Sequence, residues 1–333
     1  MNENQFGGGM PPEMAVFWTE YTEKKRIRRA AWAVAAPGLV FFVFTFFFGM
    51  IVTFIAARFG ISVQKIRETL LEPAVNEVLQ IILSVLLMTV PFIAFSKIEK
   101  YSISESGGFN KPKKGTAVAS VMFGLGFCAF ANIAVSAAGE LFKSFGFKSN
   151  VPQSVYPEGV FGFLLAVIST AIVPGLVEEF AFRGIVLGLL RRWGDAFAVV
   201  TSAAIFGILH GNFEQMPFAF LVGLVLGFIR IKSDSVIVCM AVHALNNLIA
   251  VLLSYAGNIS VVATNIVYTV YLLLALTAAV LGALLLKGEN GFSFPPPERR
   301  ISARKTYVCF FFSPAMIILT LVFLFRALTY VFF

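Results

Sequence analysis

The chain has 333 residues, of which 58% are hydrophobic and 13% are charged. Soluble proteins carry about 45 to 50% apolar and about 25% charged residues, so this composition indicates an integral membrane protein and excludes nucleic-acid-binding, disulfide-rich and disordered classes. The formal net charge is +8, and its meaning depends on where the basic residues lie relative to the membrane spans.

Nine apolar runs are candidates for membrane-spanning helices, because about 20 helical residues are needed to cross about 30 Å of hydrocarbon. In chain order they cover residues 31–57, 78–96, 116–138, 159–190, 196–210, 217–231, 235–255, 261–286 and 307–333. The fifth and sixth runs are short for a full crossing. The fourth is long and contains Pro174 and Gly175, where we expect a kink. The sequence therefore predicts an all-α, multi-pass integral membrane protein with about eight to nine transmembrane helices.

Most lysines and arginines fall between alternate runs, in residues 24–29, 97–114, 191–192, 230–232 and 287–305. The other segments between runs carry only Arg58, Lys65, Arg67, Lys143 and Lys148. Because the cytoplasmic loops of membrane proteins carry an excess of Lys and Arg, this pattern predicts a cytoplasmic N-terminus. The predicted organisation is a cytoplasmic N-terminal segment at 1–30, a transmembrane bundle at 31–286, a cytoplasmic linker at 287–306 and a C-terminal transmembrane helix at 307–333.

Polar side chains inside the apolar runs gather between residues 178 and 247. They are Glu178, Glu179, Arg183, His210, His243, Asn246 and Asn247, and the two histidines are the only ones in the chain. A charged side chain within a membrane helix costs roughly 2.5 to 3.5 kcal/mol on insertion scales, so such residues are functional candidates by default. We therefore predict one polar site within the membrane, built from the fourth, fifth and seventh runs.

Helical spacing predicts different surroundings for these side chains. Glu179 and Arg183 are four residues apart and share a face, so we expect a structural ion pair. Glu178 lies five residues from Arg183, roughly 140° around the helix, and is expected to point elsewhere and stay free for chemistry. His243 and Asn247 are again four residues apart, which places an imidazole and an amide on one face.

Three short patterns occur in order along this stretch: EExxxR at residues 178–183, FxxxH at 206–210 and HxxxN at 243–247. Together they resemble the signature motifs of the CAAX-protease and bacteriocin-processing (CPBP) family of intramembrane peptidases, which includes the type II CAAX prenyl endopeptidases. The resemblance implies an all-helical bundle that encloses a polar intramembrane cavity. It places the peptidase core at about 159–250.

The resemblance also implies an activity and roles for individual residues. The protein is expected to be a hydrolase, an intramembrane endopeptidase that cleaves a peptide bond of a membrane-anchored peptide or protein. Glu178 with His210 would activate a water, and His243 with Asn247 would stabilise the oxyanion. Asn246 competes with Asn247 for that role, because the helix can present either amide. The lipid bilayer is the other expected partner, and nucleic acid is not expected.

A catalytic zinc site is the alternative use of the two histidines, since His210, His243 and Glu178 make up a three-ligand set. Glu178 would then be a ligand and another group would have to act as the base, and the chain has no HExxH motif. We favour a glutamate-driven hydrolysis without a bound metal or other cofactor. The zinc-dependent, metalloprotease-like reaction stays open.

Two other classes of protein also place polar residues inside a helical bundle. A proton-coupled transporter does so at mid-membrane, but it usually has paired broken helices, and the break at Pro174 has no counterpart in a second half of the chain. A catalytically idle scaffold or a bacteriocin-immunity protein could use the same fold without chemistry. The completeness of the three motifs argues against this last reading.

Overall fold

The computed structural model describes residues 11–151, 155–287, 293–294 and 300–332. In these ranges every named element is helical and no β-strand is formed. Eight helical segments in them are long and apolar enough to cross a membrane: Glu13–Arg58, Pro73–Ile98, Lys114–Ser144, Gly159–Trp193, Gln215–Ser233, Val236–Ile259, Val261–Lys287 and Pro314–Val331. The apolar helix Asp195–Leu209 is shorter. The predicted all-α, multi-pass class is confirmed.

The α-helices are α1 (Pro12–Arg58), α2 (Val63–Leu71), α3 (Pro73–Ile98), α4 (Ile103–Ser106), α5 (Lys114–Ser144), α6 (Gly159–Ala166), α7 (Val173–Glu179), α8 (Leu187–Leu190), α9 (Asp195–Leu209), α10 (Gln215–Ser233), α11 (Val236–Ile259), α12 (Val261–Lys287), α13 (Ala303–Phe311) and α14 (Pro314–Phe332). Two π-helical segments, η2 (Val167–Ile172) and η3 (Phe180–Val186), and one 3₁₀ turn, η4 (Arg191–Trp193), complete the set.

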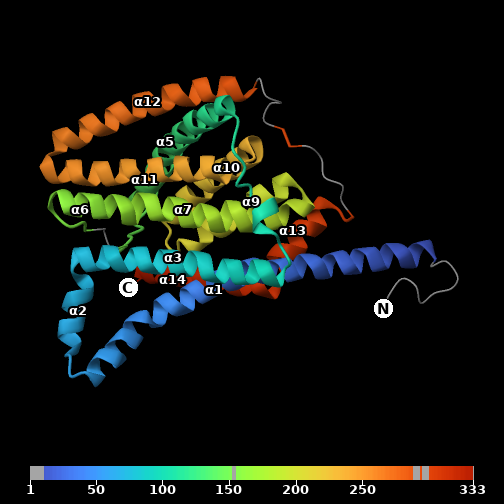
Figure 1. Ribbon diagram of the computed structural model, residues 1–333, viewed down its shortest axis with the longest axis horizontal. Helices are drawn as coiled ribbons and strands as arrows, with labels where there is room; N and C mark the ends of the chain where they lie inside the picture. Colours follow the sequence, from blue (N-terminus) through green and yellow to red (C-terminus); the bar gives the residue numbers. More distant parts are fainter. Residues whose placement is uncertain (1–10, 152–154, 288–292, 295–299, 333) are drawn as a thin grey trace.

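The continuous run from α6 to η4 lies in the middle of the bundle. Helices α1, α3 and α14 lie on one side of it, and α11, α10, α5 and α12 lie on the other (Figure 1). Buried apolar side chains of α1, α3, α8, α9 and α14 form one core cluster, and those of α5, α10 and α11 form a second. Because protein covers both sides of this run, polar side chains on it can face other helices instead of lipid.

The irregularity expected near Pro174 takes the form of a widened turn. The segment Gly159–Trp193 is one apolar helical span of 35 residues, and the π-helical segments η2 and η3 flank the short α7 within it. Proline has no N–H to donate to the carbonyl four residues earlier. Local π-helical turns and side chains of neighbouring helices are the usual means by which membrane helices accommodate that loss.

Helix α1 is longer than the membrane span it contains. It begins at Pro12 and has 47 residues, so the described part of the predicted N-terminal segment is helical and continuous with the first span, while residues 1–10 lie outside the described ranges. Figure 1 shows α1 bending along its length and projecting past the other helices at its N-terminal end. Pro37 lies inside the helix, and a proline at such a position commonly causes a bend.

The basic segments predicted from the sequence meet at one end of the bundle, which we call the basic end. Nε of Arg29 on α1 lies 2.6 Å from Oε1 of Glu99, which follows α3. Nη1 of Arg191 lies 3.9 Å from Oδ1 of Asp234, which follows α10. Further contacts at this end join Asn110 to Asp234, Lys232 to Ser293 and Lys305 to Glu20. Segments far apart in the sequence thus form a single basic surface.

We expect the basic end to face the cytoplasm, because cytoplasmic loops carry the excess of Lys and Arg. Single-cysteine variants test this orientation in a background that lacks Cys128, Cys239 and Cys309. Lys113→Cys lies before α5 at the basic end, and an impermeant thiol reagent outside intact cells should leave it unlabelled. Lys65→Cys on α2 is the matched exposed site at the other end and should be labelled. If Lys113→Cys were labelled and Lys65→Cys were not, the topology would be the reverse of the predicted one.

The C-terminal part of the chain packs into the bundle as two helices. The single helix predicted at 307–333 is divided into α13 and α14 by a break just before Pro314. The side chains of Phe310, Met316, Leu319 and Phe323 are fully buried in the core cluster that includes α1 and α9. The predicted linker lies partly outside the described residues, at 288–292 and 295–299. The last span is therefore an integral part of the bundle.

Candidate active site

The two glutamates and Arg183 lie where α7 meets η3 on the central run. π-Helical turns inside α-helices frequently occur at functional sites. Gly175 lies one turn before the glutamates, and a Cβ atom at that position would lie 2.9 Å from Cβ of Ala244 on α11. Since ordinary Cβ contacts are longer than this, a glycine at 175 allows α11 to approach the glutamates closely.

Glu179 and Arg183 form a fully buried ion pair. Nη1 of Arg183 donates to Oε1 of Glu179 at 2.7 Å. Nη2 of Arg183 donates to the carbonyl of Gly223 on α10 at 3.3 Å, and the guanidinium carbon lies 4.6 Å from the centroid of the Phe206 ring. Within the described ranges Oε2 of Glu179 and Nε of Arg183 have no hydrogen-bond partner. Loss of Glu179 would therefore leave the buried guanidinium without its counter-ion, and loss of Arg183 would leave the buried carboxylate without the guanidinium.

His243 lies between the two glutamates. Its Nδ1 donates to Oε1 of Glu179 at 2.8 Å, and its Nε2 lies 3.9 Å from Oε2 of Glu178. The side chain of Glu178 is 22% exposed, whereas that of Glu179 is fully buried. The helical spacing placed Glu178 away from the ion pair, and it makes no ion pair with Arg183. Both carboxylates nevertheless approach the same imidazole, because the ring reaches across from α11.

His210 caps the C-terminal end of α9. Its Nδ1 lies 2.8 Å from the carbonyl oxygen of Phe206. A carbonyl can only accept, so Nδ1 carries the hydrogen and Nε2 of the neutral ring is left as an acceptor. The Phe206 ring lies between the two histidines, with its centroid 4.9 Å from that of His210 and 6.0 Å from that of His243.

The two asparagines on α11 are linked to each other and to the central run. Nδ2 of Asn246 donates to Oδ1 of Asn247 at 3.2 Å, and Nδ2 of Asn247 donates to the carbonyl of Thr170 at 3.0 Å. Thr170 is four residues before Pro174, so its carbonyl is the one that proline leaves without the usual helical donor. One amide hydrogen of Asn247 therefore has a structural partner, while the second remains available for a ligand.

Glu77 is a polar residue of the bundle interior that the sequence analysis missed. It lies near the start of α3, is 3% exposed and accepts a hydrogen bond from Ser169 in η2. Ser169 directly precedes Thr170, so Glu77 contacts the same widened turn that Asn247 contacts. The signal was present in the sequence as a carboxylate at the edge of the second apolar run, one residue outside its assigned start.

Tyr101 supports the segment η3 from outside the spans. Its hydroxyl donates to the carbonyl of Gly184 at 2.9 Å. Burial raises the pKa of Tyr101 to about 12, so the phenol keeps its hydrogen, and with it the donor, at neutral pH. The loop after α3 thereby satisfies a backbone carbonyl of the π-helical segment that follows the glutamates.

Glu178, His210 and His243 are the three residues predicted to hold zinc in the alternative reaction. In the part of the chain that the structure describes, no group of three or more His, Cys, Asp or Glu side chains is arranged to hold a metal ion. The choice between a metal-free and a zinc-dependent reaction stays a prediction.

Comparison with known protein families matches residues 160–249 to the family described as Type II CAAX prenyl endopeptidase Rce1-like. This range contains all three motifs, and the match confirms the predicted resemblance to CPBP intramembrane peptidases. It supports a hydrolase of the CAAX-protease type in a multi-pass membrane protein. No curated protein and no solved structure gave a match.

Proposed function

We propose that the protein is an intramembrane endopeptidase that hydrolyses a peptide bond of a membrane-associated peptide or protein. The observation that supports the proposal is the position of His243 between the carboxylates of Glu178 and Glu179, with His210 stacked against the same Phe206 ring. The family match over the same stretch of chain supports it. Buried ionisable residues are expensive within a membrane, and such a group is expected to have a function.

Glu178 is proposed as the base that activates water. Its carboxylate is partly exposed and can take a proton from a water held between it and His210. Nε2 of His210 accepts a hydrogen bond from the other hydrogen of that water, which stays on the oxygen, because the Phe206 carbonyl holds the hydrogen of the ring on Nδ1. The water oxygen then attacks the scissile carbonyl carbon. General-base catalysis of this kind contributes typically about 10² to 10⁴ in rate.

His243 and Asn247 are proposed to stabilise the oxyanion that this attack produces. For that role Nε2 of His243 must carry a proton. Nδ1 keeps its own proton and donates it in the hydrogen bond to Glu179, so the ring acts as an imidazolium beside two carboxylates. The second amide hydrogen of Asn247 supplies a neutral donor. Glu178 then returns its proton to the leaving nitrogen as the C–N bond breaks, which yields a new carboxyl terminus and a new amine.

Paired substrates test the proposed activity. The full-length protein in liposomes is given a peptide panel in which each sequence is present once with a membrane anchor and once without. We expect cleavage at a defined bond in at least one anchored peptide and much slower cleavage of its unanchored partner, because the proposed site lies inside the bundle. Equal cleavage of both forms would argue for a site open to bulk water, and no cleavage of any peptide would argue against the activity.

We expect hydrolysis to survive a strong chelator. In the proposed reaction the histidines act through hydrogen bonds and proton transfer, whereas in a zinc reaction both imidazoles must be neutral ligands. The measurement compares initial rates before and after treatment with the chelator, together with the metal content of the purified protein. About one zinc per chain, with activity lost on chelation and restored by added Zn²⁺, would move Glu178 from base to ligand.

A further inference from the structure

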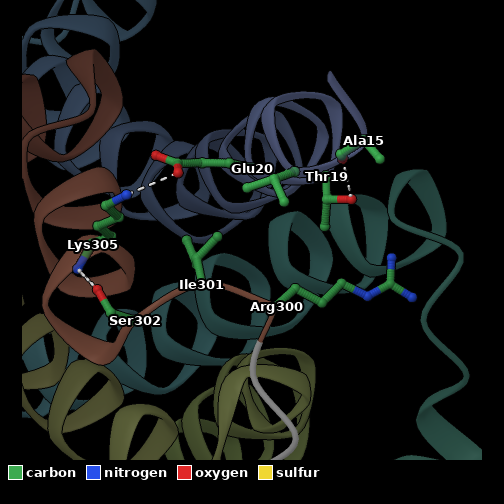
Figure 2. Close-up of a pocket in the computed structure, with 8 residues that line it drawn as sticks. Ala15, Thr19, Glu20, Arg300, Ile301, Ser302 and Lys305 are labelled. Carbon is green, nitrogen blue, oxygen red and sulfur yellow. Dashed lines mark hydrogen bonds and ion pairs between the residues drawn. The ribbon is translucent and has the colours of Figure 1, made fainter. Parts of the chain in front are cut away.

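A second polar site lies at the basic end, away from the candidate active site. Two cavities of about 420 and 250 Å³ lie between the N-terminal part of α1, the start of α13 and the turn at η4. Both are lined by Arg300 and Ile301, so they adjoin one another, and we call the two together the α1–α13 groove. In the larger cavity Lys305 reaches Glu20 on α1, while the Arg300 side chain extends away from that pair (Figure 2).

Three arginines surround the smaller cavity: Arg26 on α1, Arg192 in η4 and Arg300 before α13. The guanidinium carbon of Arg192 lies 4.6 Å from the centroid of the Trp193 ring. Among the described residues no hydrogen bond or ion pair involves the guanidinium of Arg300. Nε of Arg192 donates to the carbonyl of Leu189 at 3.0 Å, so the guanidinium of Arg300 and the remaining N–H groups of Arg192 are the donors available for a ligand.

One carboxylate, that of Glu23, lines the same cavity. Its Oε1 accepts from Nε1 of the buried Trp193 at 2.6 Å, and its Oε2 lies 3.7 Å from Nη1 of Arg26. Three cations thus face a single anion that is already engaged, so the cavity keeps an excess of positive charge. An anionic ligand would compensate that excess.

We propose that the α1–α13 groove binds a phosphate group, and that an anionic phospholipid headgroup supplies it. The planar guanidinium presents paired N–H groups that match the geometry of phosphate oxygens, and three arginines converge on a cavity of about 250 Å³. The site does not depend on the proposed peptidase activity, since none of its residues touches the candidate active site.

The opposite face of α1 favours a lipid as the source of the phosphate. Phe17, Trp18 and Tyr21 lie next to Val16, Thr19 and Glu20 of the groove but are exposed and contact one another, with centroids 5.7 to 6.3 Å apart. Aromatic side chains of this kind are enriched at the level of the lipid headgroups. Basic residues near that level attract anionic lipids. With these aromatic side chains at the level of the headgroups, the groove would face the phosphates of the lipids.

Binding to the purified full-length protein tests the site, with dioctanoyl phosphatidic acid, dioctanoyl phosphatidylcholine and inorganic phosphate as probes. We expect phosphatidic acid to bind at least about tenfold more tightly than phosphatidylcholine. Arg300→Gln and Arg26→Gln should each weaken its binding about tenfold through the loss of a charge-assisted contact. Tighter binding of phosphatidic acid than of inorganic phosphate supports the lipid source, and equal binding keeps the phosphate site but overturns that source.

Arg304→Gln is the matched control, because Arg304 is an exposed residue four positions after Arg300, at the start of α13, and lines neither cavity. It removes the same charge at the same end of the bundle and should change binding less than about twofold. Unchanged thermal unfolding of Arg300→Gln shows that the variant is folded, as expected for an exposed side chain. Equal losses in Arg300→Gln and Arg304→Gln would overturn the site in favour of diffuse attraction to the basic end.

Discussion

Replacing Glu178 by glutamine should lower the rate of hydrolysis by about 10² to 10⁴ while leaving the protein folded. Glutamine keeps the shape of the side chain but cannot take a proton from water. Glu178 is partly exposed, and its carboxylate forms an ion pair with His243, whose Nε2 lies 3.9 Å from Oε2 of Glu178. Initial rates of cleavage of an anchored peptide, measured beside the thermal unfolding midpoint, separate the loss of chemistry from loss of structure.

Glu140→Gln is the control for this substitution. Glu140 is an exposed carboxylate at the end of α5, paired with Lys143, and its replacement should leave the rate unchanged. The decisive comparison is with Glu179→Gln, which changes the neighbouring carboxylate in the same way. If Glu178→Gln kept full activity and Glu179→Gln lost it while folding normally, the roles of the two glutamates would be reversed.

Replacing Arg183 by alanine should destabilise the protein by about 3 to 5 kcal/mol, the cost of breaking a buried ion pair and leaving the other charge behind. Oε1 of Glu179 accepts hydrogen bonds from Arg183 and from His243, so the substitution also disturbs the imidazole. Glu179→Gln should be destabilising for the same reason. Unfolding of the purified protein in mixed micelles, followed as a function of detergent composition, measures the effect.

Arg191→Ala provides the matched control, because Arg191 forms an i,i+4 pair with Asp195 but its side chain is 37% exposed. Pairs of this exposure contribute about 0 to 1 kcal/mol, so this variant should unfold almost like the wild type. A similar small effect for Arg183→Ala would mean that the buried pair is not the structural support we infer.

The sequence was sufficient to locate the polar site because the information needed there is local. Apolar runs identify the spans, and spacing along one helix predicts that Glu179 and Arg183 share a face. The two histidines stand out because they are the only ones in the chain and both lie in apolar runs. Each of these inferences uses only neighbours in the chain, so none depends on how the helices pack.

The missing details arise from contacts between helices. The reach of His243 across both glutamates depends on the close approach that Gly175 permits. The contact of Asn247 with Thr170 depends on the position of α11 beside the turn that Pro174 disrupts. Glu77 reaches this turn from α3, some ninety residues earlier in the chain. Spacing within one helix carries no information on such pairs.

The basic end illustrates the same limit. The positions of the lysines and arginines predict which segments share a side of the membrane, and the structure places those segments together. Their spacing does not indicate that Arg26, Arg192 and Arg300 surround one cavity, because the three residues belong to segments far apart in the chain. The groove depends on the packing of α13 against α1, whereas the sequence suggested a separate C-terminal span.

Hydrolysis in water labelled with a heavy oxygen isotope tests whether Glu178 activates the water that cleaves the peptide bond. The reconstituted protein is incubated with an anchored peptide, and the new carboxyl terminus is examined by mass spectrometry. We expect the wild type to introduce one labelled oxygen into the new carboxyl terminus at a single cleaved bond, and we expect no such product from Glu178→Gln. Absence of labelled product from every anchored peptide, or equal labelling by Glu178→Gln, would contradict a peptidase in which Glu178 activates water.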